Sequence, residues 1–203
     1  MDVRGPTALY VELESNRWRQ LARSRAANVE MTHATFMYGS NLDPQRLHAR
    51  APAWDGTYRI AKLPQHELRF HKRSERYRVA ANVVPHQTRC VWGILVYLCD
   101  RDLARMDSCE GCYREPPHYR RLSATVHLSD RLIDCHLLEK EQRSAYLYIA
   151  SSVWHVEGLQ PTIDYMAHVI SGAVWCGLPS AYINAIARLG LPSSVRSYRN
   201  PGS

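Results

Sequence analysis

The sequence predicts a mixed α+β fold in which a curled or barrel-like β-sheet is surrounded by helices. Strand-like stretches dominate the chain from residue 33 to residue 150, and helical stretches follow from residue 162 onward. One of the strands, Val91–Leu98, is apolar almost throughout, which indicates burial on both faces. The 203 residues are 45% hydrophobic, which is enough for one folded domain with a sizeable core.

Composition divides the chain into three parts. Residues 1–30 are rich in arginine and lack a strong hydrophobic period, so we expect an N-terminal extension with a helix around Val11–Ala26. Residues 31–190 form the predicted domain, because Met31 leads directly into the first strand-like stretch. Residues 191–203 contain mainly Ser, Arg, Pro and Gly, and we expect them to be a loosely held C-terminal tail.

The first half of the domain is predicted to alternate between strands and turns. His33–Tyr38 reads as a strand, and Gly39–Asn41 reads as the turn that follows it. Asp43 is a helix N-cap followed by Pro44 at the first helical position, which predicts a short helix through about Ala49. Further strands are predicted at Tyr58–Leu63, His66–Phe70, Val79–Val84 and Val91–Leu98.

The second half begins with a helix and ends with two. Asp100 can cap a helix Arg101–Ser108, which Gly111 terminates. Three strands are predicted to follow, at Tyr119–Leu128, Leu132–Leu138 and Ser144–Ala150. Thr162–Ala173 is apolar around most of its circumference and reads as an enclosed helix, and a break at residues 177–179 separates it from a final helix, Ser180–Leu189.

Part of the net charge of +7 lies in one basic segment, residues 69–78. Its cations are Arg69, Lys72, Arg73, Arg76 and Arg78, and Glu75 is its only acid. Such a segment could bind nucleic acid or guide anionic substrates. It has no interleaved aromatic array and no nucleic-acid-binding motif, so nucleic-acid binding is disfavoured and a solvated loop or edge strand is expected.

Cysteines and histidines give no sign of a metal site. The six cysteines are expected to be reduced, because the chain shows no signal peptide. Cys109 and Cys112 form a C-x-x-C motif, but no second pair stands at zinc-ribbon spacing and no thioredoxin-like pattern surrounds it. The ten histidines contain no H-E-x-x-H motif.

No apolar run approaches the roughly 18 residues of a membrane span. The N-terminus lacks the apolar region of a secretion signal. We therefore expect a cytoplasmic protein without membrane contact. The sequence leaves a homodimer open.

Two short motifs carry the chemistry. Tyr38–Leu42 is a turn-forming stretch after an apolar run, and Glu110 precedes a glycine where a helix ends. Backbone N–H groups of such a turn can hold an anionic or carbonyl ligand, and a partly enclosed carboxylate can move a proton. Together they predict an acid/base enzyme that acts on a small polar substrate.

Three blocks of residues, in this order, resemble the γ-glutamylcyclotransferase family, which includes γ-glutamylamine cyclotransferases. The first block is the loop Tyr38–Leu42. The second is a strand–helix–glutamate segment with Val91-Trp92-Gly93, Asp102-Leu103, Met106-Asp107 and Glu110-Gly111, followed by Tyr119. The third contains Tyr165, Gly172, Ala173, Gly177, Leu178, Pro179 and Tyr182. The resemblance spans about Thr32 to Leu189 and leaves out the first thirty residues.

The resemblance implies an enzyme that converts a γ-glutamyl amide into 5-oxoproline and a free amine, without metal or organic cofactor. It implies that Glu110 is the catalytic acid and base, partly buried beside Tyr97 and Tyr119. The residues that it implies for substrate binding are Tyr38, Gly39, Ser40, Asn41, Leu42, Tyr119, Tyr146 and Tyr165. The expected partner is a small γ-glutamyl compound.

Two questions stay open at this level. The first is whether the chain is active or is a catalytically idle member of the fold that binds a ligand or a protein. The second is the leaving group, because γ-glutamyl amino acids, γ-glutamyl amines and γ-glutamyl intermediates of antibiotic assembly are all known in the family. The long, proline-rich stretch after Glu110 places Arg114 and His118 on the expected leaving-group side, and the basic charge mildly favours an anionic group there.

Overall fold

The computed structural model describes residues 31–129 and 139–191. The expected N-terminal extension with its helix around Val11–Ala26 and the expected strand Leu132–Leu138 lie outside these residues, as does the expected tail apart from Leu191. Within the described part, no helix is long and apolar enough to cross a membrane.

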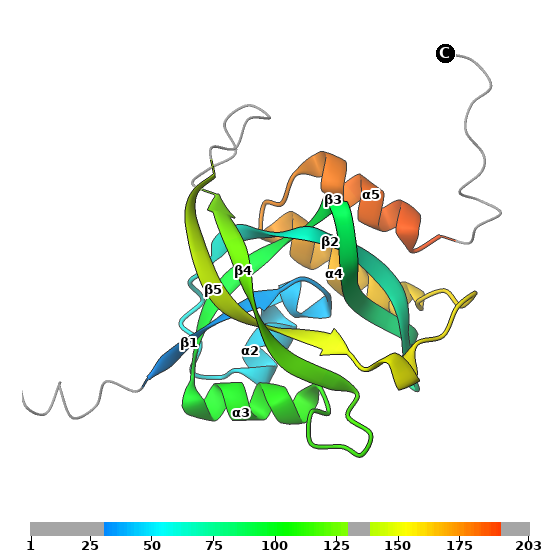
Figure 1. The fold of residues 1–203 in the computed structure, drawn as a ribbon, viewed down its shortest axis with the longest axis horizontal. Helices are drawn as coiled ribbons and strands as arrows, with labels where there is room; N and C mark the ends of the chain where they lie inside the picture. The colour runs from blue at the N-terminus through cyan, green and yellow to red at the C-terminus, as the bar shows by residue number, and fades with distance from the viewer. Residues whose placement is uncertain (1–30, 130–138, 192–203) are drawn as a thin grey trace, which may run out of the picture. The chain divides into compact units, whose positions relative to one another are not determined.

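The fold is α+β, built on a sheet that closes into a barrel (Figure 1). The strands are β1 (Thr32–Met37), β2 (Arg59–Ser74), β3 (Arg78–Cys99), β4 (Tyr119–Ser129) and β5 (Glu139–Ala150). Their order around the barrel is β1-β3-β2-β4-β5, and a parallel contact between β1 and β5 closes it. The predicted fold class is confirmed.

Two pairs of predicted strands are single long strands in the structure. The predicted strands at 58–63 and 66–70 are both parts of β2, which begins at Arg59, and those at 79–84 and 91–98 are both parts of β3. The interruption that the sequence suggests is a register shift, where Pro64 faces Cys90 but His66 faces Pro85. A shift of this kind bends a strand pair without ending it, which lets two long strands curl around a barrel.

A second irregularity lies in the basic segment. Phe70 faces Ala81 and Lys72 faces Ala80, so His71 is an extra residue in β2. Such a bulge interrupts the alternation of side chains, and the neighbours His71 and Lys72 are both buried. The expectation that the whole basic segment is a solvated loop or edge strand is therefore wrong for its middle.

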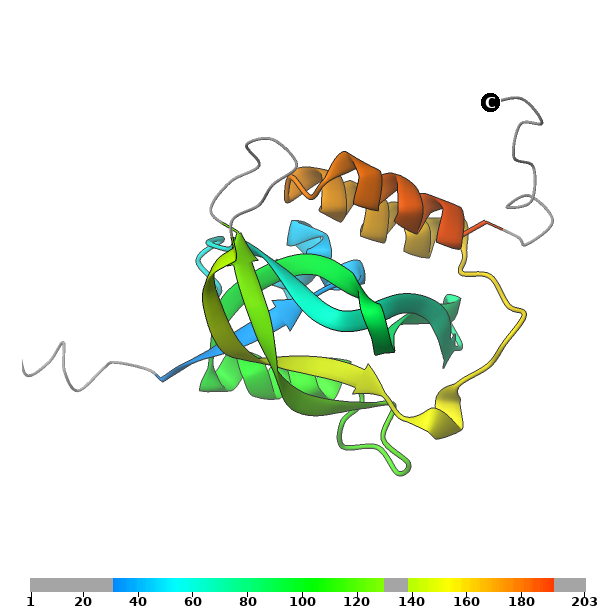
Figure 2. The same ribbon diagram turned by 45° about the horizontal axis from the view of Figure 1, so that its top comes forward.

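Helices cover the barrel on two sides (Figure 2). α4 (Ile163–Trp175) and α5 (Ser180–Leu189) lie on one side, and α3 (Asp100–Cys109) lies on the other. α2 (Pro44–Arg50) follows a single 3-10 turn, η1 (Ser40–Leu42), and a second 3-10 turn, η2 (Ser152–Trp154), follows β5. The four helices predicted within residues 31–190 are thus all present, and only the helix predicted around Val11–Ala26 falls outside the described residues.

The core has two parts, and β3 lies between them. Leu95 belongs to a cluster that packs the strands against α4 and α5. Ile94 and Val96 belong to a second cluster with residues of α2 and α3. All three side chains are fully buried, which confirms that this stretch is covered on both faces.

Near its start, β3 has a backbone edge that side chains from other elements bond, and this edge borders the site. β1 pairs only with residues 94–99 of β3, so no strand among residues 31–129 and 139–191 lies beside this edge of β3 near Ala81. Side chains from other elements bond this edge instead. The Ala81 amide donates to the Tyr165 hydroxyl on α4 at 2.8 Å, and the Ala81 carbonyl accepts from the Tyr119 hydroxyl on β4 at 2.7 Å.

Candidate active site

A small pocket lies where β1, η1, the end of α3 and the free edge of β3 meet. We call it the inner pocket; its volume is about 40 Å³. Its lining residues are Phe36, Met37, Tyr38, Gly39, Ser40, Asn41, Ala81, Glu110, Tyr119, Tyr148 and Tyr165. The structure therefore brings together seven of the nine residues that the sequence suggested: Tyr38, Gly39, Ser40, Asn41, Glu110, Tyr119 and Tyr165.

The loop after β1 forms one wall of the inner pocket. Within it the Leu42 amide donates to the Gly39 carbonyl at 3.0 Å. Its first amides, those of Ser40 and Asn41, have no acceptor in the described part of the chain, as is usual at a helix start. A Cβ atom at Gly39 would lie 3.1 Å from the Ala81 Cβ, so glycine allows the loop to approach β3 closely.

Leu42 does not line the inner pocket. Its side chain is fully buried in the core cluster that joins the strands to α2 and α3. It thus anchors the loop from behind, where α4 also packs. A Cβ atom at Gly172 of α4 would lie 2.4 Å from the Leu42 carbonyl carbon, so only glycine allows this helix to contact the loop directly.

Glu110 stands immediately after α3, where Gly111 adopts a φ of +68° and ends the helix. Its side chain is 13% exposed. Oε1 accepts from Asn41 Nδ2 at 3.0 Å and from Arg50 Nη1 at 2.6 Å, and the same Arg50 nitrogen donates to Asn41 Oδ1 at 2.7 Å. Oε2 has no partner among the described residues, so one oxygen is held and the other is available.

Buried phenols form the rest of the wall. Tyr38 donates to the backbone carbonyl of Tyr148, and Tyr119 and Tyr165 bond the edge of β3. Burial raises the pKa of the Tyr38, Tyr119, Tyr148 and Tyr165 hydroxyls. Their hydroxyls thus stay protonated near neutral pH. Tyr38, Tyr119 and Tyr148 already donate their single O–H to protein acceptors, whereas the Tyr165 hydroxyl accepts from the Ala81 amide and keeps its proton for another acceptor.

Tyr146 lies outside the inner pocket. Its ring packs 5.9 Å from the His33 ring and 4.8 Å from the Arg121 guanidinium carbon. Tyr148, two residues further along the same face of β5, occupies the wall instead. The buried carboxylate of Asp107 fixes Tyr148 by accepting from its hydroxyl at 2.8 Å, while Arg121 donates to the other oxygen of Asp107 at 2.7 Å.

Tyr97 is also placed differently from the expectation. Its side chain is 46% exposed, and it lines neither the inner pocket nor the cleft described next. Alternation along β3 explains this, because Val96 and Leu98 on either side of it point into the core.

The inner pocket opens into a wider outer cleft of about 510 Å³. The two share Ser40, Glu110, Tyr119 and Tyr165, so Glu110 stands at the boundary. The other lining residues of the outer cleft are Arg46, Arg50, Lys72, Arg73, Ser74, Glu75, Arg76, Tyr77, Ala80, Cys109, His118 and Trp154. Five lysines and arginines thus face two carboxylates. Of the two residues expected on the leaving-group side, His118 lines this cleft and Arg114 does not.

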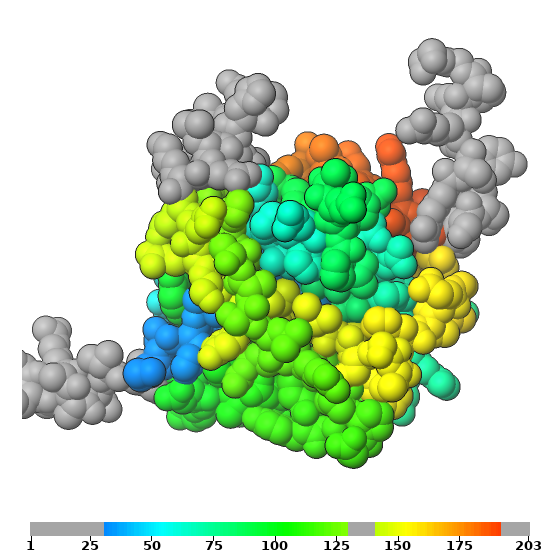
Figure 3. All heavy atoms as spheres, in the orientation of Figure 1, coloured from blue at the N-terminus to red at the C-terminus, as the bar shows by residue number. Residues whose placement is uncertain are grey.

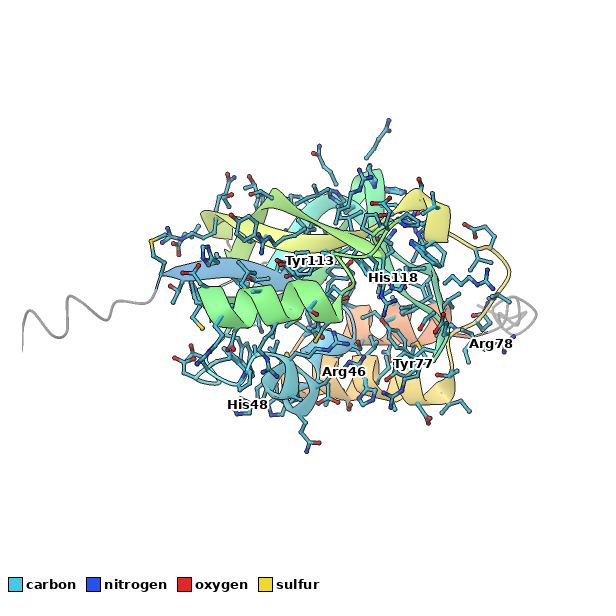
Figure 4. The ribbon with its side chains drawn as sticks, turned by 90° about the horizontal axis from the view of Figure 1, so that it is seen from below. Arg46, His48, Tyr77, Arg78, Tyr113 and His118 are labelled. Carbon is cyan, nitrogen blue, oxygen red and sulfur yellow. The ribbon has the colours of Figure 1, made fainter. Side chains whose placement is uncertain are left out.

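The outer cleft is assembled from separate elements (Figure 4). Arg46 of α2 lies beside Tyr77 of the β2–β3 turn, and its Nη1 donates to the Tyr77 hydroxyl at 2.8 Å. His118, from the loop after α3, meets Trp154 of η2 edge to face with ring centroids 4.5 Å apart. In the space-filling view the green chain after α3 and the yellow chain after β5 meet at the surface (Figure 3).

Sequence reasoning missed Arg46, Arg50 and Tyr148. It named Lys72 only as part of the basic segment and not as a residue of the site. Arg46 and Arg50 stand four residues apart in a predicted helix, and this spacing puts both on one face, so they could have been found. Tyr148 shares a strand face with Tyr146, and the choice between them had no local signal. The burial of Lys72 depends on a β-bulge, and no local sequence pattern predicts that bulge.

No group of three or more His, Cys, Asp or Glu side chains within residues 31–129 and 139–191 is arranged to hold a metal ion. The C-x-x-C motif shows no sign of redox activation either. Burial, with the charges of Asp107 and Glu110, raises the pKa of the Cys112 thiol to about 12. Cys109 and Cys112 are both free thiols.

A family model decides the relationship of this chain to known proteins. The model described as "Gamma-glutamyl cyclotransferase, AIG2-like" matches residues 35–167, which contain the loop, Glu110 and the pocket tyrosines. The chain belongs to the AIG2-like γ-glutamyl cyclotransferase family. A search of curated proteins found no match.

Solved structures with the same fold agree with this assignment. A human protein described as uncharacterized has 22% identity and a TM-score of 0.66, over 85% of this chain and 94% of its own. A γ-glutamyl cyclotransferase has 21% identity and a TM-score of 0.65 over the same shares. A yeast γ-glutamyl cyclotransferase described as specific to glutathione has 12% identity and a TM-score of 0.55, over 84% of this chain and 99% of its own. At these identities the likeness shows the fold alone.

Proposed function

We propose that the chain converts a γ-glutamyl amide into 5-oxoproline and a free amine, with Glu110 as the group that carries the proton. One observation carries the proposal. The Glu110 carboxylate lies in the same small pocket as the loop Gly39–Asn41, held through Oε1 and with Oε2 unengaged in the described chain. Family membership supports the reaction class.

The proposed reaction is an intramolecular acyl transfer. The α-amino nitrogen of the γ-glutamyl group attacks its own γ-carbonyl carbon and closes a five-membered ring. The bond from that carbon to the leaving nitrogen then breaks, and no water is consumed. A well-oriented intramolecular attack reaches effective molarities on the order of 10⁵ M or more, so holding the right conformer supplies much of the acceleration.

Glu110 serves both proton transfers in this scheme. Oε2 takes a proton from the attacking amine and returns it to the leaving nitrogen, so the side chain ends as it began. A positioned acid/base group contributes about 10²–10⁴-fold. The unengaged amides of Ser40 and Asn41 are the candidates to stabilise the tetrahedral oxyanion, and each such donor is worth about 3–4 kcal/mol in comparable sites.

Substitution of Glu110 tests the proposal. Glu110→Gln keeps the shape of the side chain and its bond to Arg50 but cannot cycle a proton, so 5-oxoproline formation should fall by at least about 100-fold. The assay is 5-oxoproline release from a panel of γ-glutamyl amino acids and amines. Glu141→Gln is the matched control, because Glu141 pairs with Arg59 at the same 2.6 Å distance on the surface and should leave turnover unchanged.

The panel also separates an enzyme from an idle member of the family. Turnover of at least one compound by the wild type, lost in Glu110→Gln, supports the enzyme. Tight binding of one compound with no turnover of any would favour a binding protein. Undiminished turnover by Glu110→Gln would refute the role given to Glu110.

A further inference from the structure

The outer cleft contains a buried lysine that forms no ion pair within the described part of the chain. Lys72 is 6% exposed, and its Nζ makes no hydrogen bond or ion pair with any described residue. Its ammonium lies 5.4 Å from the centre of the Tyr119 ring and 5.6 Å from that of the Trp154 ring. A buried cation is costly unless an anion or several acceptors compensate it.

The position of Lys72 is built into the sheet. The extra residue His71 interrupts the alternation of β2, and the next side chain enters the cleft wall between β4 and η2. Burial lowers the pKa of Lys72, and the charges of Glu110 and Glu75 oppose that effect. Neither glutamate forms a hydrogen bond or ion pair with the ammonium. The Lys72 ammonium is therefore available to bind an anion in the cleft.

Two more donors border the same cleft without an acceptor in the described part of the chain. They are Nε of Arg46 and Nε1 of Trp154, both buried. The other end of Arg46 is fixed by its bond to Tyr77. Buried donors are normally bonded. With the Lys72 ammonium, the outer cleft thus has three donors without a partner in the described chain, against one such carboxylate oxygen, Oε2 of Glu110, at its inner end, and this excess of donors suits an anion.

Geometry relates this cleft to the proposed reaction. The inner pocket and the outer cleft share the wall at Glu110 and Tyr119. A γ-glutamyl group in the inner pocket would place its amide nitrogen near Glu110, and the leaving group would then extend into the outer cleft. Lys72 touches this shared wall through the Tyr119 ring.

We propose that Lys72 binds a carboxylate of the leaving group, so that the substrates are γ-glutamyl amino acids or peptides rather than γ-glutamyl derivatives of neutral or cationic amines. The inference rests on the proposed function and adds the chemical class of the substrate. The charge of the cleft agrees, since its five cations face only Glu75 and Glu110, and Glu110 is already paired with Arg50. A polyamine product would be repelled there.

A pair of substrates of equal shape tests the inference. γ-Glutamylalanine and γ-glutamylalaninamide differ only in a carboxylate against a neutral amide. The wild type should prefer γ-glutamylalanine in kcat/KM by at least about tenfold, the typical worth of one charge-assisted hydrogen bond, with most of the difference in KM. The readout is the ratio of the two kcat/KM values.

Three variants assign the preference to one side chain. Lys72→Met removes the charge but keeps an apolar stem, and should bring the ratio close to one. Lys72→Arg keeps the charge and should retain most of the ratio. Lys62→Met is the matched control, because Lys62 also lies on β2 over an aromatic ring, that of Trp92 at 5.8 Å, but outside the cleft; its ratio should equal that of the wild type.

Each outcome decides something. Equal kcat/KM for the two compounds in the wild type overturns the inference, as does an unchanged ratio in Lys72→Met, while the cyclotransferase proposal stands. If neither compound yields 5-oxoproline, the proposed function fails for this substrate class. Calorimetric titration of both compounds then decides on Lys72: tighter binding of γ-glutamylalanine that Lys72→Met loses supports the site, and equal or absent binding overturns it.

Discussion

At the scale of single residues, the arrangement around Glu110 is a closed triangle. Glu110, Asn41 and Arg50 come from the end of α3, the loop after β1 and the end of α2, and each bonds the other two. A carboxylate held at one oxygen by two partners has little rotational freedom. The triangle thus aims Oε2, which is what proton transfer to a small substrate needs.

Replacing Arg50 should lower kcat without unfolding the chain. Arg50→Met leaves Asn41 as the only partner of Glu110, so the carboxylate can rotate out of line. A misplacement of about 1 Å can cost on the order of 100-fold in rate, and we expect kcat to fall by about 10- to 100-fold. Steady-state kinetics with the best substrate of the panel measures this.

Arg59→Met is the control for that substitution. Arg59 pairs with Glu141 at the same 2.6 Å distance, but both side chains are about a third exposed. Surface pairs of this kind contribute about 0–1 kcal/mol, so activity should not change. Equal loss in both variants would mean that Arg50 acts through stability and does not position Glu110.

The sequence pointed to most single residues of the inner pocket, because the motifs are local. Tyr38–Asn41 and Glu110 each carry a turn or helix-end pattern of their own. Tyr148 and Lys72 do not. Their positions depend on which strand face turns inward and on a bulge, and both are properties of the closed barrel rather than of neighbouring residues.

At the scale of elements, strand boundaries were the weakest part of the prediction. Pro64 and Pro85 are prolines, which usually interrupt strands, and the predicted strands end beside them. In the structure Gln65 adopts a φ of +54° and the pairing continues on a shifted register. Tertiary pairing between β2 and β3 outweighs these local preferences, which single-sequence patterns cannot show.

The contact between α4 and the loop makes a second prediction. In Gly172→Ala the added Cβ would meet backbone atoms of Leu42 and Asp43 at 2.4 Å, so the helix or the loop must move. Overpacking of this kind costs about 1–3 kcal/mol. Thermal unfolding should show a lower Tm, and kcat/KM should fall because the loop forms a wall of the inner pocket.

The neighbouring residue supplies the control. Ser171 is on the same helix but exposed, so Ser171→Ala should change stability by no more than about 0.5 kcal/mol. If Gly172→Ala behaves like Ser171→Ala, the close packing of α4 on the loop is not what holds the loop in place.

At the scale of the whole molecule, stability should depend on a buried histidine, His71, the extra residue of the β2 bulge. His71 is 5% exposed and stacks on His155 with ring centroids 4.2 Å apart. Burial lowers the pKa of His71, and the nearby charge of His155 adds to this, against an opposing contact with Glu157. The folded chain therefore holds His71 neutral where the unfolded chain would protonate it.

The sign of the pH dependence follows from that shift. The unfolded state binds more protons below the ordinary histidine pKa of about 6.5, so stability is fully present above that pH and is lost as the pH falls. Tm should decrease between pH 7.5 and pH 5.5, a range above the titration of carboxylates. His71→Gln should flatten the decrease, with a smaller remainder from His118, whose pKa burial also lowers. A decrease of equal size in the variant would contradict the assignment.

The edge of β3 that Tyr119 and Tyr165 occupy has a consequence for how activity arises. Its two phenols arrive from segments that lie 38 and 84 residues further along the chain. A fragment ending before α4 would keep Glu110 and the loop. It would lack Tyr165, which forms one side of the inner pocket, and the helix that packs behind the loop. Catalytic competence should therefore emerge late during refolding and all at once, as a property of the finished assembly rather than of any portion of it.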